Sequence, residues 1–159
     1  MTAVVQSGNV TPGHLAAWVT TDTLGDGGPP IGQSETVLAR LLGANFNTTG
    51  DQQIALPGTV TKVCLTRLIV TNASISLTTA AGGFYPQPGK AGTAIVANSQ
   101  VYSALTDATK LLNPTLTAYG TGTLFTSSIL TAFSLYFALT TPQGAPATAD
   151  IYVCGIVLG

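Results

Sequence analysis

The chain has 159 residues, enough for one domain with an appended segment, and a domain of this size buries a core without needing a disulfide or a metal. Charged residues make up only 7% of it, against about 25% in an ordinary soluble domain, and the formal net charge is −1. So few charges protect a monomer poorly against self-association. The composition therefore indicates that partner subunits cover much of the surface.

Two classes of partner are excluded by the distribution of charge and apolar residues. A nucleic-acid-binding protein needs a basic stripe, whereas the five basic residues here are scattered along the chain. Every apolar run is shorter than the 18 or so residues of a membrane span, so we expect no membrane insertion. The N-terminus lacks a basic residue followed by an apolar core, so no secretory signal is expected.

Taken in order, residues 1–32 differ from the rest because they are rich in Gly and Pro. One strand-like fragment, residues 14–21 (HLAAWVTT), lies among them and holds the only Trp of the chain. A segment with so little apolar surface cannot offset its own ordering entropy, so its order must come from docking. We therefore predict an extended arm that makes intermolecular contacts through four anchor residues, namely His14, Leu15, Trp18 and Val19.

Residues 33–43 contain the best helix candidate. Ser34 is a suitable N-cap, Glu35 favours the positive end of a helix dipole, and Gly43 supplies a C-terminal stop. The segment spans about two turns, so we predict a short helix that links the arm to the body.

In residues 44–159, short apolar segments alternate with turn residues in the spacing of an all-β domain. The stretch 65–85 (LTRLIVTNASISLTTAAGGFY) has two apolar segments around a polar break at Asn72, which predicts a β-hairpin or one long strand bent there. In its second half, Ile75, Leu77 and Thr79 alternate with polar residues, the period of a half-buried strand.

Further strands are predicted on either side of Gly, Pro and Asn breaks, over residues 52–56, 93–102, 110–112, 115–119, 130–139 and 150–158. In residues 130–139 the pattern places Phe133, Leu135, Phe137 and Leu139 on one face. About eight strands with turns every 8–12 residues predict a β-sandwich of the jelly-roll type.

Residues that carry chemistry are few. The single histidine, His14, lies in the arm, so we expect no catalytic triad, and no cofactor or metal site is predicted. Asp22 and Asp26 either hold Ca²⁺ with backbone carbonyls or, as we prefer, are turn residues. Cys64 and Cys154 lie in apolar strand patterns, which favours free thiols over a disulfide. The aromatics either pack in the core, their default, or line a sugar-binding surface.

The arm, SGNVTPGHLAAWVTTDTLGDGGPP, resembles the N-terminal segment of many tailed-phage and prophage structural proteins, in which a G-H-x-x-x-W stretch precedes an Asp-Gly-Gly-Pro turn. The body phrases ANFNTTGDQQIALP, IVTNASISLTTAAGGFYP and ALTTPQGAPATADIYV resemble small β-rich virion proteins of the head decoration or head fibre type. Together these phrases cover about half of the chain. They carry no active-site residues.

The resemblance implies a non-enzymatic protein of the virion, assembled in the cytoplasm of the host bacterium. We expect a capsid decoration or cement protein that bridges subunits of the major capsid protein, and the resemblance implies a homotrimer. The alternative is a tail or head fibre module that binds host-surface glycan. A hydrolase of the host envelope is the least favoured, because the chain has one histidine and no paired acids beyond Asp22 and Asp26.

Overall fold

The computed structural model describes residues 5–6, 16–20, 23–26, 35–58, 62–119, 129–132 and 134–158. The chain divides into two compact units, Met1–Ser34 and Glu35–Gly159. The described residues of both units form strands and loops and include no helix. Among them there is accordingly no helix long and apolar enough to cross a membrane.

The first unit holds a three-stranded sheet. Its strands are β1 (Val5–Gln6), β2 (Ala16–Thr20) and β3 (Thr23–Asp26), in the order β1-β3-β2. β2 pairs antiparallel with β3, and β1 pairs parallel with it. The strand-like fragment predicted over 14–21 corresponds to β2. Asp26 was predicted in a turn, but it ends β3 and pairs with Ala16, while Asp22 lies outside the described residues.

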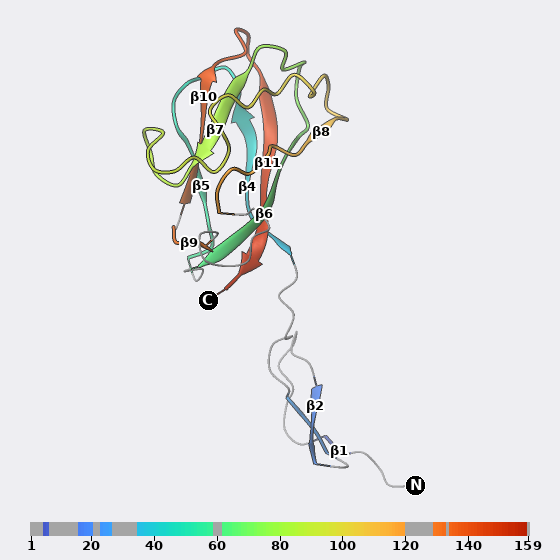
Figure 1. The fold of residues 1–159 in the computed structure, drawn as a ribbon. Coiled ribbons are helices and arrows are strands. Elements are labelled where there is room, and N and C mark those ends of the chain that lie inside the picture. The colour runs from blue at the N-terminus through green and yellow to red at the C-terminus, as the bar shows by residue number, and fades with distance from the viewer. Residues whose placement is uncertain are drawn as a thin grey trace. The chain divides into compact units, whose positions relative to one another are not determined.

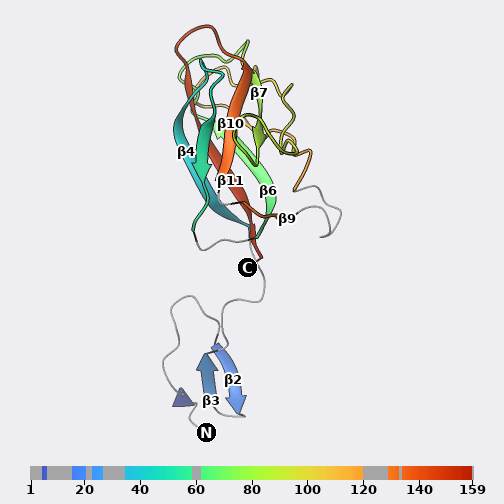
Figure 2. The same ribbon diagram turned by 90° about the vertical axis from the view of Figure 1, so that its left-hand side faces the viewer.

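The second unit is built from two antiparallel sheets. The first sheet has the order β4-β11-β6-β8, from Thr36–Asn45, Thr148–Val157, Val63–Thr71 and Leu111–Leu112, and β9 (Ile129–Leu130) also pairs with β6. The second sheet has the order β5-β10-β7, from Gln52–Ala55, Ser134–Thr141 and Ala81–Tyr85. Figures 1 and 2 show β11 running between β4 and β6. The prediction of an all-β sandwich is confirmed.

Successive strands alternate between the two sheets. β4 lies in the first sheet, β5 in the second, β6 in the first and β7 in the second, and β8, β10 and β11 continue the alternation. Between β7 and β8, Val96 and Val101 make isolated bridges to Phe84 and Ala81, so this segment extends the second sheet beyond β7. This alternation is the connectivity of a jelly roll, with the bridged segment in place of the strand predicted over 93–102.

The core lies between the sheets, where inward-facing residues alternate along each strand. Leu135, Phe137 and Leu139 are fully buried, as the pattern of residues 130–139 predicted. Phe137 is also the centre of an aromatic cluster, with its ring centroid 4.9 Å from that of Phe46 and 5.1 Å from that of Phe84. Phe46 directly follows β4 of the first sheet, while Phe84 and Phe137 lie in β7 and β10 of the second. The cluster therefore packs the two sheets against each other.

The predicted linking helix over 33–43 is wrong, because residues from Thr36 form β4, an edge strand of the first sheet. Helix propensity over two turns is marginal, and antiparallel pairing with β11 outweighs it. Gly43 does adopt a left-handed conformation (φ 64°), but at a register irregularity of the β4–β11 pair, where its N–H donates to Asp150 Oδ1 at 2.8 Å. The sandwich thus begins before residue 44.

The predicted hairpin over 65–85 is also wrong. β6 and β7 lie in different sheets, and the residues between them form an irregular crossover. Asn72 does mark the break, with φ 55° directly after β6. Leu77 is fully buried and Ile75 is 39% exposed, although the alternation had placed both on one face of a strand.

Candidate functional site

The four predicted anchor residues belong to the first unit. His14 and Leu15 lie outside the described residues, while Trp18 and Val19 lie in β2. The backbone of Trp18 pairs with that of Leu24 in β3. Trp18 and Val19 are thus placed at adjacent positions of a paired strand of the arm.

The outer surface of the first sheet is a second candidate. Tyr152 of β11 pairs with Arg40 of β4 on one side and with Ile69 of β6 on the other, so the three share one face. Ile151 and Val153, on either side of Tyr152, are fully buried, which places this face away from the core. We call Val37, Arg40, Leu42, Ile69 and Tyr152 the β4 face.

The β4 face carries exposed aliphatic side chains next to the charged residues Arg40 and Arg67, the latter opposite Val37 across β11. Val37 is 58% exposed and Leu42 is 55% exposed, and both belong to β4 at the edge of the sheet. Among the residues that the structure describes, no strand pairs with the outer edge of β4. An edge strand of ten residues with exposed apolar side chains is a surface on which another protein chain can pack.

An ion pair fixes one end of this sheet. Glu35 Oε1 lies 2.9 Å from Arg67 Nε and accepts a hydrogen bond of 2.6 Å from Thr66 Oγ1. Both contacts cross from the residue before β4 to β6. These two contacts therefore hold the residue before β4 at a defined position beside β6. The ion pair is exposed, so it adds little to the free energy of unfolding.

The outer surface of the second sheet has a different composition. Tyr136 of β10 pairs with Gln53 of β5 and with Tyr85 of β7, which makes a row across the three strands. Gln53 Nε2 also donates a hydrogen bond of 2.7 Å to Ser134 Oγ on the same strand as Tyr136. We call Gln53, Tyr85, Ser134 and Tyr136 the tyrosine face.

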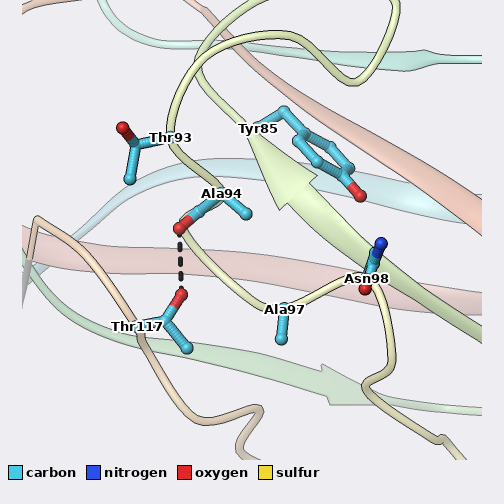
Figure 3. A pocket seen from close by; sticks show the side chains of 6 residues that line it. All are labelled: Tyr85, Thr93, Ala94, Ala97, Asn98 and Thr117. Atoms are coloured by element: carbon cyan, nitrogen blue, oxygen red, sulfur yellow. Dashed lines mark hydrogen bonds between the residues drawn. The ribbon is translucent and has the colours of Figure 1, made fainter.

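Two open hollows lie on the tyrosine face. One, of about 440 Å³, is shown in Figure 3 and is lined by Tyr85, Thr93, Ala94, Ala97, Asn98 and Thr117. Thr117 Oγ1 donates to the carbonyl oxygen of Ala94 at 2.9 Å and fixes its wall (Figure 3). The other, of about 300 Å³, is lined by Pro86, Gln87, Pro88, Thr131, Ala132, Ser134 and Tyr136.

Polar contacts hold the loop that borders these hollows. The Asp51 carboxylate accepts a hydrogen bond from the N–H of Gly89, and Lys90 Nζ donates to the carbonyl oxygen of Thr49 at 3.3 Å. Gly89 itself has φ 72°, which suits a glycine in a tight turn. Burial, together with the nearby Asp51 carboxylate, raises the pKa of the Tyr85 phenol. Tyr85 is buried, at 4% exposure, and its hydroxyl is neutral at physiological pH.

Within the part of the chain that the structure describes, no group of His, Cys, Asp and Glu is arranged to hold a metal ion. Cys64 is half-buried and Cys154 is buried, and both are free thiols, as predicted. Tyr102 is fully buried, and burial raises the pKa of its phenol well above the usual range. Its hydroxyl donates to the Gly82 carbonyl oxygen at 3.2 Å, which gives it a structural role.

Sequence reasoning missed the β4 face and did not single out the tyrosine face, although it allowed that the aromatics line a sugar-binding surface. The β4 face was hidden by the assignment of residues 33–43 to a helix, although the β-branched pair Thr36-Val37 was a signal for a strand. The tyrosine face depends on the pairing of residues 85 and 136, which are far apart in the sequence, and only the fold brings them together.

No protein-family model matches the chain, and comparisons with curated proteins and with solved structures find no match.

Proposed function

We propose that this chain is a structural protein of a tailed-phage virion that decorates the capsid and bridges subunits of its shell. The proposal takes its class from the resemblance of the arm and body phrases to small virion proteins. Its physical support is the division of the chain into an arm unit and a jelly-roll unit, together with a surface that has few charges. Jelly rolls occur in viral capsid proteins among other classes.

The observation that carries the proposal is the β4 face. A protein that is free in solution gains nothing from two exposed aliphatic side chains on an open edge strand, whereas an assembling protein buries them. In the proposed assembly the β4 face packs between copies of this chain in a homotrimer. The arm then attaches that trimer to the major capsid protein, with Trp18 as its anchor.

Attachment in this way would stabilise the shell by binding linkage. A protein that binds the assembled shell and not its separated subunits lowers the free energy of the assembled state alone. Electron cryomicroscopy of the virion is the direct test, and we expect density for the jelly roll on the capsid surface. Density on the tail with a bare head would contradict the proposal.

Removal of the arm separates attachment from folding. A variant that lacks residues 1–32 keeps β4 and all later strands, so we expect it to fold and to lose binding to capsid shells. Trp18→Ala should weaken attachment of the full chain by about 2–4 kcal/mol if Trp18 is a hot spot. Binding is measured by co-sedimentation with shells, and an arm-deleted protein that still co-sediments would rule out this role of the arm.

The trimer is tested on the β4 face with a matched pair of substitutions. Val37→Lys places a charge on the β4 face, and Val101→Lys does the same at a site of equal exposure (58% and 57%) away from it. Burial of one such side chain is worth about 1.5–3 kcal/mol, so Val37→Lys should weaken association at least about tenfold. Light scattering should show monomers for Val37→Lys and trimers for Val101→Lys. Loss of the trimer in both variants, or in neither, would remove the β4 face from the assembly.

A fibre module that binds host glycan is the second candidate. The observation that favours it is the pair of tyrosines on the outer surface of the second sheet. This role is compatible with a place in the virion and differs from decoration in needing a ligand outside the particle.

A further inference from the structure

The tyrosine face combines an aromatic floor with neutral hydrogen-bonding groups. Tyr136 is half-buried and lines one hollow, and its cross-strand partner Tyr85 lines the other, so the two hollows are neighbours. A third hollow shares Gln87 with the hollow beside Tyr136 and Thr93 with the hollow beside Tyr85. The three hollows therefore lie next to one another along the loop of residues 86–93, and we call them together the groove.

Among the residues that the structure describes, none with a charged side chain lines any of the three hollows. The two charged residues of the neighbouring loops are not in the lining of the hollows, and each makes a backbone hydrogen bond, Asp51 from the N–H of Gly89 and Lys90 to the carbonyl oxygen of Thr49. A charged ligand would lose its hydration here without gaining an opposite charge. The lining thus selects an uncharged ligand that is rich in hydroxyl groups.

Ser134 and Gln53 provide a donor and an acceptor side by side. Ser134 Oγ accepts the 2.7 Å hydrogen bond from Gln53 Nε2, and among the described residues its own hydroxyl donates to no other group. The Oε1 of the same Gln53 amide is then free to accept. A sugar hydroxyl both donates and accepts one hydrogen bond or more, so this pair suits it.

From these contacts we infer that the groove along the tyrosine face binds a neutral oligosaccharide. The apolar C–H face of a pyranose ring packs on the ring of Tyr136, and its hydroxyls bond Ser134, Gln53 and Gln87. A second sugar unit occupies the hollow beside Tyr85, where Asn98 and Thr93 offer further donors and acceptors (Figure 3). The hollow beside Tyr136, about 300 Å³, has the size of the smallest ligand pockets.

A peptide suits the groove less well. A bound peptide strand needs a free sheet edge to pair with, and the outer edge of β7 is already bridged at Phe84 and Ala81 by Val96 and Val101. A proline-rich peptide needs no such edge, and it therefore serves as a competing probe in the test.

Binding is measured by calorimetry on the full chain with maltohexaose, cellohexaose and N-acetylchitohexaose, each beside its monosaccharide. Heparin and a proline-rich peptide are the charged and peptidic probes. We expect at least one neutral hexasaccharide to bind, and more tightly than its monosaccharide because two hollows are filled. Binding of heparin or the peptide alone, or of no probe, would overturn the inference.

Four variants locate the site. Tyr136→Ala should lower affinity for the bound oligosaccharide about tenfold, because it removes the stacking surface, and Tyr136→Phe should stay within about twofold of the parent. Leu111→Ala removes an exposed side chain from β8 of the opposite sheet, outside both the β4 face and the hollows, and should leave affinity unchanged. Asn98→Ala should weaken the hexasaccharide and spare the monosaccharide.

The pattern across these variants decides the outcome. Equal losses in Tyr136→Ala and Leu111→Ala, or no loss in Tyr136→Ala, would overturn the inference. Near-ultraviolet circular dichroism confirms that each variant is folded, and if Tyr136→Ala is not, Asn98→Ala carries the test. This binding is additional to capsid decoration, and its failure would leave the test with Val37→Lys unaffected.

Discussion

The two sheets of the jelly roll differ in the length of their strands and in the side chains on their outer surfaces. Three strands of the first sheet, β4, β6 and β11, have ten, nine and ten residues, and its outer surface exposes Val37 and Leu42. Strands of the second sheet have four, eight and five residues, and its outer surface presents tyrosine, amide and hydroxyl groups beside irregular loops. Long regular strands give the flat surface that suits packing between subunits, while short strands leave room for loops that shape hollows.

The comparison is consistent with the two proposed roles, in which the first sheet packs between subunits and the second sheet binds a ligand. Both sheets share one core, however, so neither is expected to fold alone. Substitutions in the core, in each sheet and in the loops between them test how far the two sheets are independent.

The largest effect is expected at the shared core. Phe137→Ala removes the ring that contacts both Phe46 and Phe84, and it should lower the free energy of unfolding by about 3–5 kcal/mol. Urea unfolding followed by far- and near-ultraviolet circular dichroism should show one transition for both signals. Two separate transitions would mean that the sheets unfold independently.

The next largest effect is a difference in the cost of a glycine-to-alanine substitution between the two sheets. A Cβ at Gly155 of β11 would overlap the backbone of β6 at Cys64, and a Cβ at Gly83 of β7 would overlap the carbonyl oxygen of Val96, which belongs to an isolated bridge. Because a strand within the first sheet yields less than a bridged loop, Gly155→Ala should cost about 3 kcal/mol and Gly83→Ala about 1–2 kcal/mol.

The matched control for these glycines is Gly58→Ala, since a Cβ there meets no atom within 4 Å. It should change the free energy of unfolding by no more than about 0.5 kcal/mol. Equal costs at Gly155 and Gly83 in urea unfolding would show that the second sheet is as rigid as the first.

A smaller effect concerns alkaline stability. Burial raises the folded-state pKa of Tyr102 above its ordinary value of 10.0, so its contribution to stability is fully present below pH 10 and is lost as the pH rises above it. Stability should then fall by about 1.4 kcal/mol for each pH unit and each such tyrosine. Tyr102→Phe should cost about 1 kcal/mol at pH 7, through loss of the bond to Gly82, and should flatten the fall between pH 10 and 11. Urea unfolding at both pH values measures this, and an unchanged slope in Tyr102→Phe, or an equal change in Tyr152→Phe, would contradict the assignment.

The smallest effect is expected in the loop that leads from the second sheet to β8. The side-chain hydroxyl and backbone N–H of Thr109 donate to the exposed Asp107 carboxylate and lower its pKa below 3.8. Its contribution to stability is therefore present above about pH 4 and is lost as the pH falls through the lowered pKa. Asp107→Asn should reduce the loss of thermal stability between pH 5 and pH 3. A variant that follows the parent curve over this range would show that the loop contributes nothing to it.

The parts of the fold that the sequence predicted are those where pattern and pairing agree. Leu135, Phe137 and Leu139 are buried as their period-two pattern predicted, and the closing strand near residues 150–158 forms β11, although Ala138 and Cys154 between the alternating positions are buried as well. The hairpin failed because period two also occurs in a crossover whose N–H groups find distant partners. Leu77 donates to the carbonyl oxygen of Leu105, and Thr79 donates to Gln143 Oε1, and neither contact is visible in the local pattern.

The candidate sites were harder to predict for the same reason. Trp18 could be singled out because one tryptophan in a Gly- and Pro-rich arm is conspicuous in composition alone. Leu42 was assigned to a short linking helix, and its exposure became apparent only when β4 was placed at the edge of a sheet. Tyr85 and Tyr136 meet through strand register, which depends on the whole fold.

The position of β11 also has a consequence during synthesis. β11 is the partner of both β4 and β6, and the bond from Gly43 to Asp150 joins residues 107 positions apart. While a ribosome is still translating the residues before Thr148, β4 and β6 have emerged without the strand that belongs between them. The first sheet is then completed only after translation of β11, and the nascent chain carries exposed strand edges until that moment, a state in which a chaperone would protect it from aggregation.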